Sequence, residues 1–421
     1  MMNPKNIKPA VPKYRFKGAY DKDGNWIAFT DPWEQRKLGD IITEYKETVD
    51  SDCTLPILTS SKTEGVILQE EHFGRKQQHD ITGYNILPRN YCTYRNRSDG
   101  VDFTFNINKC CDKGIISKFY PVFSGKNSDV FFLSLVLNNS EEVVREIAYT
   151  CTGTGQKVLS FLDLQKMKVR VPNFDEQKEI AAYFESLDHI ITLVERKCEN
   201  YRKAKQAMMQ KLFSQEVRFT ADDGSEFPEW EEKAIWEITT WDKKFNEVEK
   251  YKQQSVIKYP YVLADTLKNM KDNKGSVKLL STGTYMDYTT EKKAGKNLCE
   301  GEIIAIPWGG EPNIKYHKGK FVTSDNRIAQ AADTQTTNLK WLAYCMSSKM
   351  TEIKSYYRGA SIKHPSMKAI LDMHITIPSS IEEQTKIADC LSKYDDLITA
   401  TENKLTAYRQ LKKCMLQNMF A

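Results

Sequence analysis

The sequence has no apolar run that could cross a membrane. Its most apolar stretch, residues 130–137, is far shorter than the roughly 20 apolar residues that a spanning helix needs. Residues 1–18 carry lysine and proline but no apolar core, so they do not form a secretory signal. We therefore expect a cytoplasmic protein with no membrane partner, whose residues 1–30 form an N-terminal arm.

Patterns for metals, disulfides and catalysis are also missing. The ten cysteines form no CxxC pair, and neither they nor the six histidines have zinc-finger spacing. The "HKGK" at 317–320 lacks the glycine spacing of a phosphate-binding loop, and no N-P-P-F/Y element or supported Ser/His/Asp set occurs. We expect no catalytic residue, metal ion or cofactor on this chain.

Enough apolar and aromatic residues are present for packed domains. Hydrophobic residues make up 40% and aromatic residues 11% of the 421 positions, which excludes a disordered chain. The net charge of +5 is weakly basic, so it permits an anionic partner without requiring one.

The most informative feature is an internal repeat. The stretch "PNFDEQKEIAAYF" at 172–184 returns as "PSSIEEQTKIADCL" at 378–391, and setting Glu176 on Glu383 aligns 38 positions without a gap. About 15 of these 38 pairs are identical. The segments "DPWEQRKLGDI" (31–41) and "PEWEEKAIWEI" (228–238) also match, so the chain is a tandem of two units.

Both long repeats predict helices with an apolar seam whose steps alternate four and three residues, as in a coiled coil. The seam of the first helix contains Ile180, Phe184, Leu187, Ile191, Val194, Cys198, Tyr201, Lys205, Met208 and Leu212. The seam of the second contains Ile387, Leu391, Tyr394, Ile398, Thr401, Leu405, Tyr408, Lys412, Met415 and Met419. Each seam needs an apolar partner, and the other copy is the simplest one.

The helix starts and one seam position carry further signals. Residues 380–383 form a capping box, and Asn173 with Glu176 is its asparagine variant. Lys205 and Lys412 occupy equivalent seam positions, where a polar residue can fix register. The alternative is that their stems only extend to solvent.

The bodies between the helices predict sheets. Short segments rich in β-branched and aromatic residues, "GVILQEEHF", "YNILPRNYCTYRN", "VDFTFNINKC", "GIISKFYPVFS" and "DVFFLSLVL", are separated by turn residues, and similar segments occur after residue 275. Helices are expected at 131–149 and 338–357, and a short helix at each Trp-Glu opening segment.

The fold class is therefore α+β, with two β-rich mixed α/β bodies in pseudo-twofold repeat and two long helices that pair as an antiparallel coiled coil. We expect bodies at 31–171 and 215–377, the second with its opening segment. The helices should occupy 172–214 and 378–421.

Basic and amide side chains gather in the loops of both bodies. Lysine and arginine suit phosphates, whereas arginine, asparagine and glutamine can pair with base edges in the major groove. The candidates in the first body are Arg75, Lys76, Gln77, Gln78, Arg89, Arg95, Asn96, Arg97, Gln156 and Lys157. Those in the second are Lys292, Lys293, Arg358, Ser361, Lys363 and His364. One such loop is usually a solvated surface, but two clusters in each body favour DNA contact.

With these motifs the sequence resembles the specificity subunits of type I restriction-modification systems. The Trp-Glu segments, the "EQ" helix starts and the run-ins "VLSFLDLQKMKVRVP" and "HPSMKAILDMHITIP" carry the resemblance, which covers residues 14–420. It implies two target-recognition domains that each read half of a split, asymmetric DNA site, with the helices setting the gap.

The resemblance also implies partners. Two methyltransferase subunits and the restriction/translocase subunits would bring S-adenosylmethionine, ATP and Mg²⁺, and the chain itself would catalyse nothing. Two other readings stay open at this point. One is a coiled-coil scaffold that does not bind DNA; the other is a free-standing nuclease or methyltransferase, against which the missing motifs argue. The extra residues 19–29 are either decoration or a subunit contact.

Overall fold

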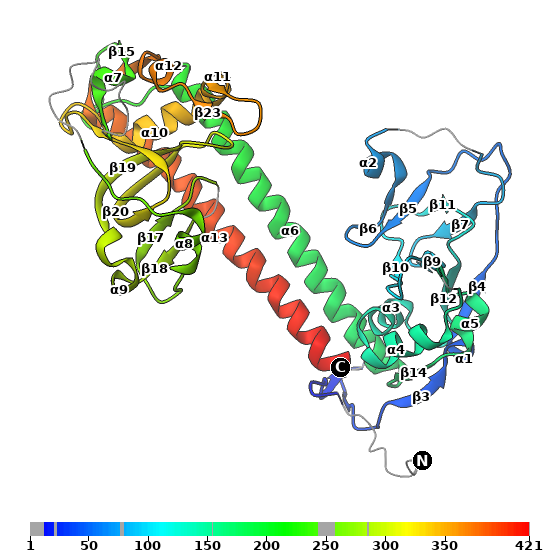
Figure 1. Ribbon diagram of the computed structural model, residues 1–421. Coiled ribbons are helices and arrows are strands. Elements are labelled where there is room, and N and C mark those ends of the chain that lie inside the picture. The colour runs from blue at the N-terminus through cyan, green and yellow to red at the C-terminus, as the bar shows by residue number, and fades with distance from the viewer. Residues whose placement is uncertain are drawn as a thin grey trace. The chain divides into compact units, whose positions relative to one another are not determined.

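The computed structural model describes residues 12–20, 23–75, 80–153, 155–242, 257–283 and 286–420. The chain divides into two compact units, residues 1–195 with 403–421, and residues 196–402. Each unit contains a β-rich body and one part of each long helix, α6 (Phe174–Phe213) and α13 (Ile381–Phe420) (Figure 1). No helix in the described ranges is long and apolar enough to span a membrane. The predicted fold class is confirmed.

Unit 1 is built around a four-stranded antiparallel sheet of order β10-β8-β12-β4, with two-stranded ribbons beside it. Its strands are β1 (Gly18–Tyr20), β2 (Trp26–Ala28), β3 (Glu34–Lys37), β4 (Ile42–Tyr45), β5 (Leu58–Ser61), β6 (Gly65–Leu68), β7 (Asn85–Pro88), β8 (Cys92–Thr93), β9 (Arg97–Ser98), β10 (Asn106–Ile107), β11 (Lys113–Ile116), β12 (Val122–Gly125), β13 (Lys157–Val158) and β14 (Lys168–Val171). Its shorter helices are α1 (Leu38–Ile41), α2 (Gln69–Phe73), α3 (Val130–Asn139), α4 (Glu141–Thr150) and α5 (Phe161–Lys166).

Unit 2 has a six-stranded sheet of order β16-β21-β19-β20-β17-β18, antiparallel except where β17 pairs with β20. Its strands are β15 (Trp230–Ala234), β16 (Thr239–Trp241), β17 (Val277–Leu280), β18 (Met286–Thr289), β19 (Cys299–Pro307), β20 (Lys315–Thr323), β21 (Asn326–Ala331), β22 (Tyr357–Arg358), β23 (His364–Pro365) and β24 (His374–Pro378). Its shorter helices are α7 (Ile235–Ile238), α8 (Ala264–Asn269), α9 (Glu291–Ala294), the 3₁₀ turn η2 (Gly295–Asn297), α10 (Leu339–Ser348), α11 (Met350–Ser355) and α12 (Met367–Leu371).

The Trp-Glu opening segments differ from their prediction. Instead of starting helices, they form β3 and β15, which pair antiparallel with β14 and β24, the strands just before the long helices. Only one helical turn follows each of them, α1 and α7. The Glu, Gln and Lys content suggested a helix, but pairing with a run-in strand outweighs that weak propensity.

The segment 129–137 was also wrongly grouped with the strands. It forms α3, whose Asp129 caps the helix by accepting a hydrogen bond from Phe132 N at 2.8 Å. A segment that is buried on all sides is apolar at nearly every position, so its sequence lacks the spacing of apolar and polar residues that distinguishes a helix from a strand. The overlapping prediction of a helix at 131–149 is right in kind, although the helix is interrupted at Ser140.

Cross-helix ion pairs hold the two long helices antiparallel inside each unit. In unit 1, Asp188 pairs with Lys412 at 2.5 Å and Glu195 with Arg409 at 2.7 Å. Unit 2 repeats the arrangement with the roles exchanged, because Lys205 pairs with Asp395 and Arg202 with Glu402, both at 2.6 Å. Within each unit the residue number falls along α13 as it rises along α6. The seam lysines thus bond across the helix pair and do not simply extend to solvent.

The seam positions of both helices are buried or half-buried throughout. At its ends the seam joins the body cores. In unit 1, Phe420 packs against Trp33, Phe132 and Phe184. The equivalent Phe213 of unit 2 packs against Trp341, which also contacts Trp230. The helices are therefore part of each unit's core.

The repeated Glu-Gln pair at each helix start fastens the helix to its body. Glu176, with its side chain fully buried, accepts two hydrogen bonds from Arg15 at 2.7 and 2.6 Å and one from Trp33 at 3.3 Å. Gln177 accepts from the Ser128 hydroxyl at 2.6 Å. The Asn173 side chain caps the helix as predicted, accepting from Glu176 N at 2.9 Å.

The second helix start repeats this arrangement. Glu383 is equally buried and accepts from Arg218 at 3.1 and 3.0 Å and from Trp230 at 3.2 Å. Gln384 accepts from Asn338 N at 2.7 Å. The capping-box prediction had each of these glutamates bonding the backbone of the cap residue. In both copies the glutamate is instead bound by an arginine that precedes the Trp-Glu segment.

Candidate nucleic-acid interface

In unit 1 a glycine hairpin gathers four of the candidate residues. Thr152 and Val158 bridge to each other, and β13 pairs with β9 so that Lys157 lies opposite Ser98. This pairing brings Gln156 and Lys157 to the segment that carries Arg95 and Arg97. Two loops about 60 positions apart in the sequence therefore form one surface.

An aromatic ring supports one arginine of this surface. The Arg97 guanidinium lies 4.4 Å from the centre of the Phe119 ring, a cation–π contact. Beside it is a groove of about 340 Å³. The groove is lined by Ser60, Lys62, Arg95, Arg97, Ser98, Asp99, Asp102, Phe103, Thr104 and Tyr120. An ion pair with Lys62, together with a hydrogen bond from Ser98, holds the pKa of Asp102 below its usual range.

Unit 2 has a hairpin of the same construction. Tyr357 pairs with Pro365 and Arg358 with His364, and the intervening loop lies against the "WGG" turn at 308–310. Gly310 N donates to the Lys363 carbonyl at 3.0 Å, and His364 Nδ1 donates to the Trp308 carbonyl at 2.7 Å. The loop is thus fixed at its base while Arg358, Lys363 and His364 remain exposed.

Two residues that the sequence did not single out support this second hairpin. Trp308 stacks against His364 with ring centres 5.1 Å apart, and Arg327 lies 3.9 Å from the Trp308 ring centre. Arg327 also pairs with Asp325 at 2.8 Å. A tryptophan followed by two glycines after an apolar strand was the available signal, because such a loop allows close backbone approach.

Both hairpins present cations that remain available to a ligand. Within the described ranges, none of Arg95, Arg97, Lys157, Arg358 and Lys363 has an ion-pair partner. Unneutralised lysines and arginines around an exposed loop are what a phosphate backbone requires.

Most of the remaining candidates lie away from the two hairpins. Arg75 follows α2 and does not line the groove, Arg89 is bound to Asp112 at 2.8 Å, and the buried Asn96 Oδ1 faces the interior without a partner in the described residues. Lys293 is paired with Asp272 at 3.2 Å. Lys292 and Lys293 lie on α9, at the opposite end of unit 2 from β23 (Figure 1). Ser361 lies in the second hairpin, and Lys76, Gln77 and Gln78 fall outside the described residues.

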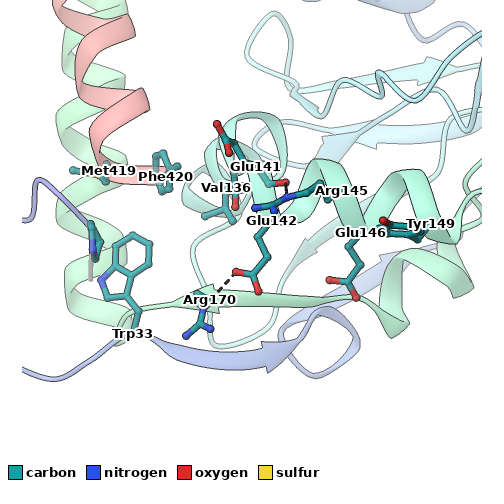
Figure 2. A pocket seen from close by; sticks show the side chains of 12 residues that line it. Trp33, Val136, Glu141, Glu142, Arg145, Glu146, Tyr149, Arg170, Met419 and Phe420 are labelled. Atoms are coloured by element: carbon teal, nitrogen blue, oxygen red, sulfur yellow. Dashed lines mark hydrogen bonds and ion pairs between the residues drawn. The ribbon is translucent and has the colours of Figure 1, made fainter. Parts of the chain in front are cut away.

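Unit 1 also has a pocket of about 500 Å³ that is lined by both acidic and basic side chains (Figure 2). Glu141, Glu142 and Glu146 of α4 line it together with the exposed ring of Tyr149. Arg170 pairs with Glu142 at 3.3 Å, and Arg145 also lines the pocket. Three glutamates against two arginines leave an excess of negative charge, which does not favour a phosphate, so we do not assign this pocket to the nucleic-acid interface.

Comparison with known proteins identifies the family. A family model described as the type I restriction modification DNA specificity domain matches residues 30–200 and again 228–407. The chain belongs to this family. The specificity subunit of the type I restriction enzyme MjaVIII from Methanocaldococcus jannaschii is 25% identical over 329 residues, which are 72% of this chain and 72% of that protein.

The fold agrees with that of a solved type I specificity subunit. The crystal structure of the S subunit from M. genitalium superposes with a TM-score of 0.63 at 13% identity, covering 98% of this chain and 99% of the other. The chain is thus the DNA specificity subunit of a type I restriction-modification system, which is a non-catalytic part of that complex. The two matches of the family model fall one on each repeat.

Proposed function

We propose that each unit reads one half of a split, asymmetric DNA site through its hairpin surface, and that the paired helices set the unread gap. The observation that carries this proposal is the glycine hairpin found in both units, whose lysine, Lys157 or Lys363, has no ion-pair partner among the described residues. The helices align without a gap over 38 positions, about 15 of them identical, while the bodies differ, as expected when two halves of a site have different sequences. The bodies at 31–171 and 215–377 would be the recognition domains.

The two methyltransferase subunits would dock at equivalent positions on the helices. Support comes from Ile190 and Leu397, which occupy the same place in the two copies and are exposed by 38% and 43% although both are large and apolar. Lys197 and Lys404 are identical and exposed beside them. S-adenosylmethionine, ATP and Mg²⁺ would be carried by the methyltransferase and restriction subunits.

The assembly of chain and methyltransferase provides the test. Sequencing methylated sites in cells that carry both should reveal two half-sequences at a fixed separation, and the purified complex should bind that DNA with an affinity that falls steeply with salt. Complexes that form without sequence-selective DNA binding would instead favour a scaffold role.

The gap-setting role can be tested separately. Seven residues inserted after both Lys197 and Lys404, which are equivalent positions of the two helix repeats, lengthen each helix by about 10 Å and preserve the seam. We expect the preferred gap to grow, by at most about three base pairs at 3.4 Å each, with both half-sequences unchanged. A changed half-sequence with an unchanged gap would contradict the role.

A further inference from the structure

The glycines of the two hairpins meet the same steric restriction. Gly153 has φ +99° and Gly359 has φ +142°, and in both cases a Cβ added to the glycine would lie 2.3 Å from the carbonyl oxygen three residues later. A side chain is therefore excluded at both glycines. The carbonyls belong to Gln156 and Ile362, and a lysine follows each of them. Gln156 and Ile362 thus occupy the same position of the same hairpin.

The residue at this position is presented outward in both units. Gln156 is exposed, and Ile362 is 60% exposed although it is among the most apolar side chains. One exposed apolar side chain is ordinary in a folded protein. Ile362 differs because its side chain is held against a turn: a Cβ on Gly309 would lie only 3.0 Å from Ile362 Cγ2, so the "WGG" turn contacts the isoleucine.

The neighbours of this position are cationic in both units. Lys157 and the nearby Arg97 flank Gln156, while Lys363 and Arg358 flank Ile362. Cations that contact the backbone phosphates position a loop on the duplex without reading sequence. The residue between them is then directed at the base edges, and it differs in chemistry between the units, being an amide in one and an apolar side chain in the other.

We propose that the third residue after each hairpin glycine is a base-reading position, with Gln156 reading an adenine and Ile362 reading the methyl group of a thymine. The chemistry follows from the side chains, because glutamine can bond both N6 and N7 of adenine, and an apolar side chain can contact only the thymine methyl in the major groove. This proposal rests on the proposed function, since it assigns residues within the half-site reading. It also requires an A·T pair in each half-site.

Base analogues test each contact without changing the rest of the DNA. The probe is the purified complex of chain and methyltransferase with a duplex that contains the sequenced site. Replacing each thymine in the half-site of unit 2 by deoxyuridine removes one methyl group at a time. We expect the substitution at one position to lower the affinity about fourfold. This factor corresponds to the loss of one buried methyl group, ~0.8 kcal/mol. Ile362→Ala should lose sensitivity at that position only.

The matched experiment in unit 1 replaces adenines by purine, which lacks the N6 amino group. Wild-type binding should weaken at one adenine, within the roughly 5- to 150-fold range of a two-pronged contact, and Gln156→Ala should remove the difference. Lys157→Ala and Lys363→Ala are the controls. They should weaken all sequences equally and reduce the salt dependence, because they remove only a phosphate contact.

Three results would overturn the assignment while leaving the proposed function intact. The first is a half-site sequence without an A·T pair. The second is a wild-type affinity that no deoxyuridine or purine substitution changes. The third is a Gln156 or Ile362 variant that lowers the affinity for all analogue duplexes by the same factor. Failure of the proposed function looks different, because the unsubstituted complex would then show no preference for the methylated sequence over a scrambled one. Thermal unfolding of each variant checks that the hairpin substitutions leave the fold intact.

Discussion

Removing Arg15 should destabilise unit 1 far more than its place at the edge of the chain suggests. The Glu176 side chain is fully buried, and the Arg15 side chain is only 15% exposed. The hydrogen bond to Glu176 raises the pKa of Arg15. A base whose folded pKa is raised contributes its stability at every pH below its usual pKa. Substitution is therefore a better probe of this pair than titration.

The expected magnitude follows from the charge left behind. Arg15→Met keeps most of the stem but leaves the Glu176 carboxylate buried without its main partner, which costs roughly 3–5 kcal/mol for a buried pair. The Trp33 N–H and the first turn of α6 still face the carboxylate and offset roughly 1 kcal/mol. We expect a loss of about 3 kcal/mol in the free energy of unfolding of unit 1.

A double-mutant cycle in denaturant measures this pair. Glu176→Gln in the Arg15→Met background removes the orphaned charge, so the double variant should recover at least half of the loss. Arg218→Met with Glu383→Gln is the matched cycle in unit 2. A loss below about 0.5 kcal/mol for Arg15→Met, or a double variant whose loss equals the sum of the single losses, would refute the reasoning.

Three further outcomes are expected. Burial lowers the pKa of Lys315 from 10.5 to about 8, so between these pH values the unfolded chain binds more protons than the folded chain. The free energy of unfolding should therefore rise by about 3 kcal/mol from pH 8 to 10.5. Denaturant titrations of Lys315→Met should not show this rise. Asp395→Ala should lower the free energy of unfolding by about 1–3 kcal/mol more than Asp188→Ala, because the Tyr344 hydroxyl donates to Asp395 at 2.6 Å and would lose its acceptor. Thermal unfolding of both variants measures this difference. In methylation assays, Gly359→Ala should abolish the sequence preference at the half-site read by unit 2 and leave the preference at the other half-site unchanged. Loss of both preferences would contradict independent reading by the two units.

The sequence predicted those parts of the fold whose signal is local and periodic. Both long helices, their caps and their seams followed from apolar spacing, and the antiparallel register is fixed by charges that the repeat displays, such as Asp188 and Lys412. The opening segments were wrong because β3 and β15 depend on strands more than 130 residues away in the sequence, which local composition cannot reveal. The role of Glu176 was missed for the same reason, since Arg15 is distant in sequence.

The candidate site was only partly predictable. Composition found the loops that carry Arg95, Arg97 and Lys363, because clusters of basic residues beside turn residues are visible in a sequence. It could not separate them from Arg89 or Lys293, whose acidic partners lie 23 and 21 positions away. The hairpin geometry itself was hidden, since a glycine in a sequence does not show its φ.

The pattern of identical and differing pairs can now be given physical causes. Identical charged pairs in the helices are required twice because each residue bonds the other copy: Glu195 with Arg409 in one unit and Glu402 with Arg202 in the other. The glutamates at the helix starts are required twice because each holds its own body. At the hairpins the same logic separates two roles, since glycine and lysine are shared while Gln156 and Ile362 are not. A subunit whose two halves read different sequences needs these two roles in separate residues. The glycine and the lysine that shape and anchor the hairpin must stay the same, while the residue that contacts the base must change.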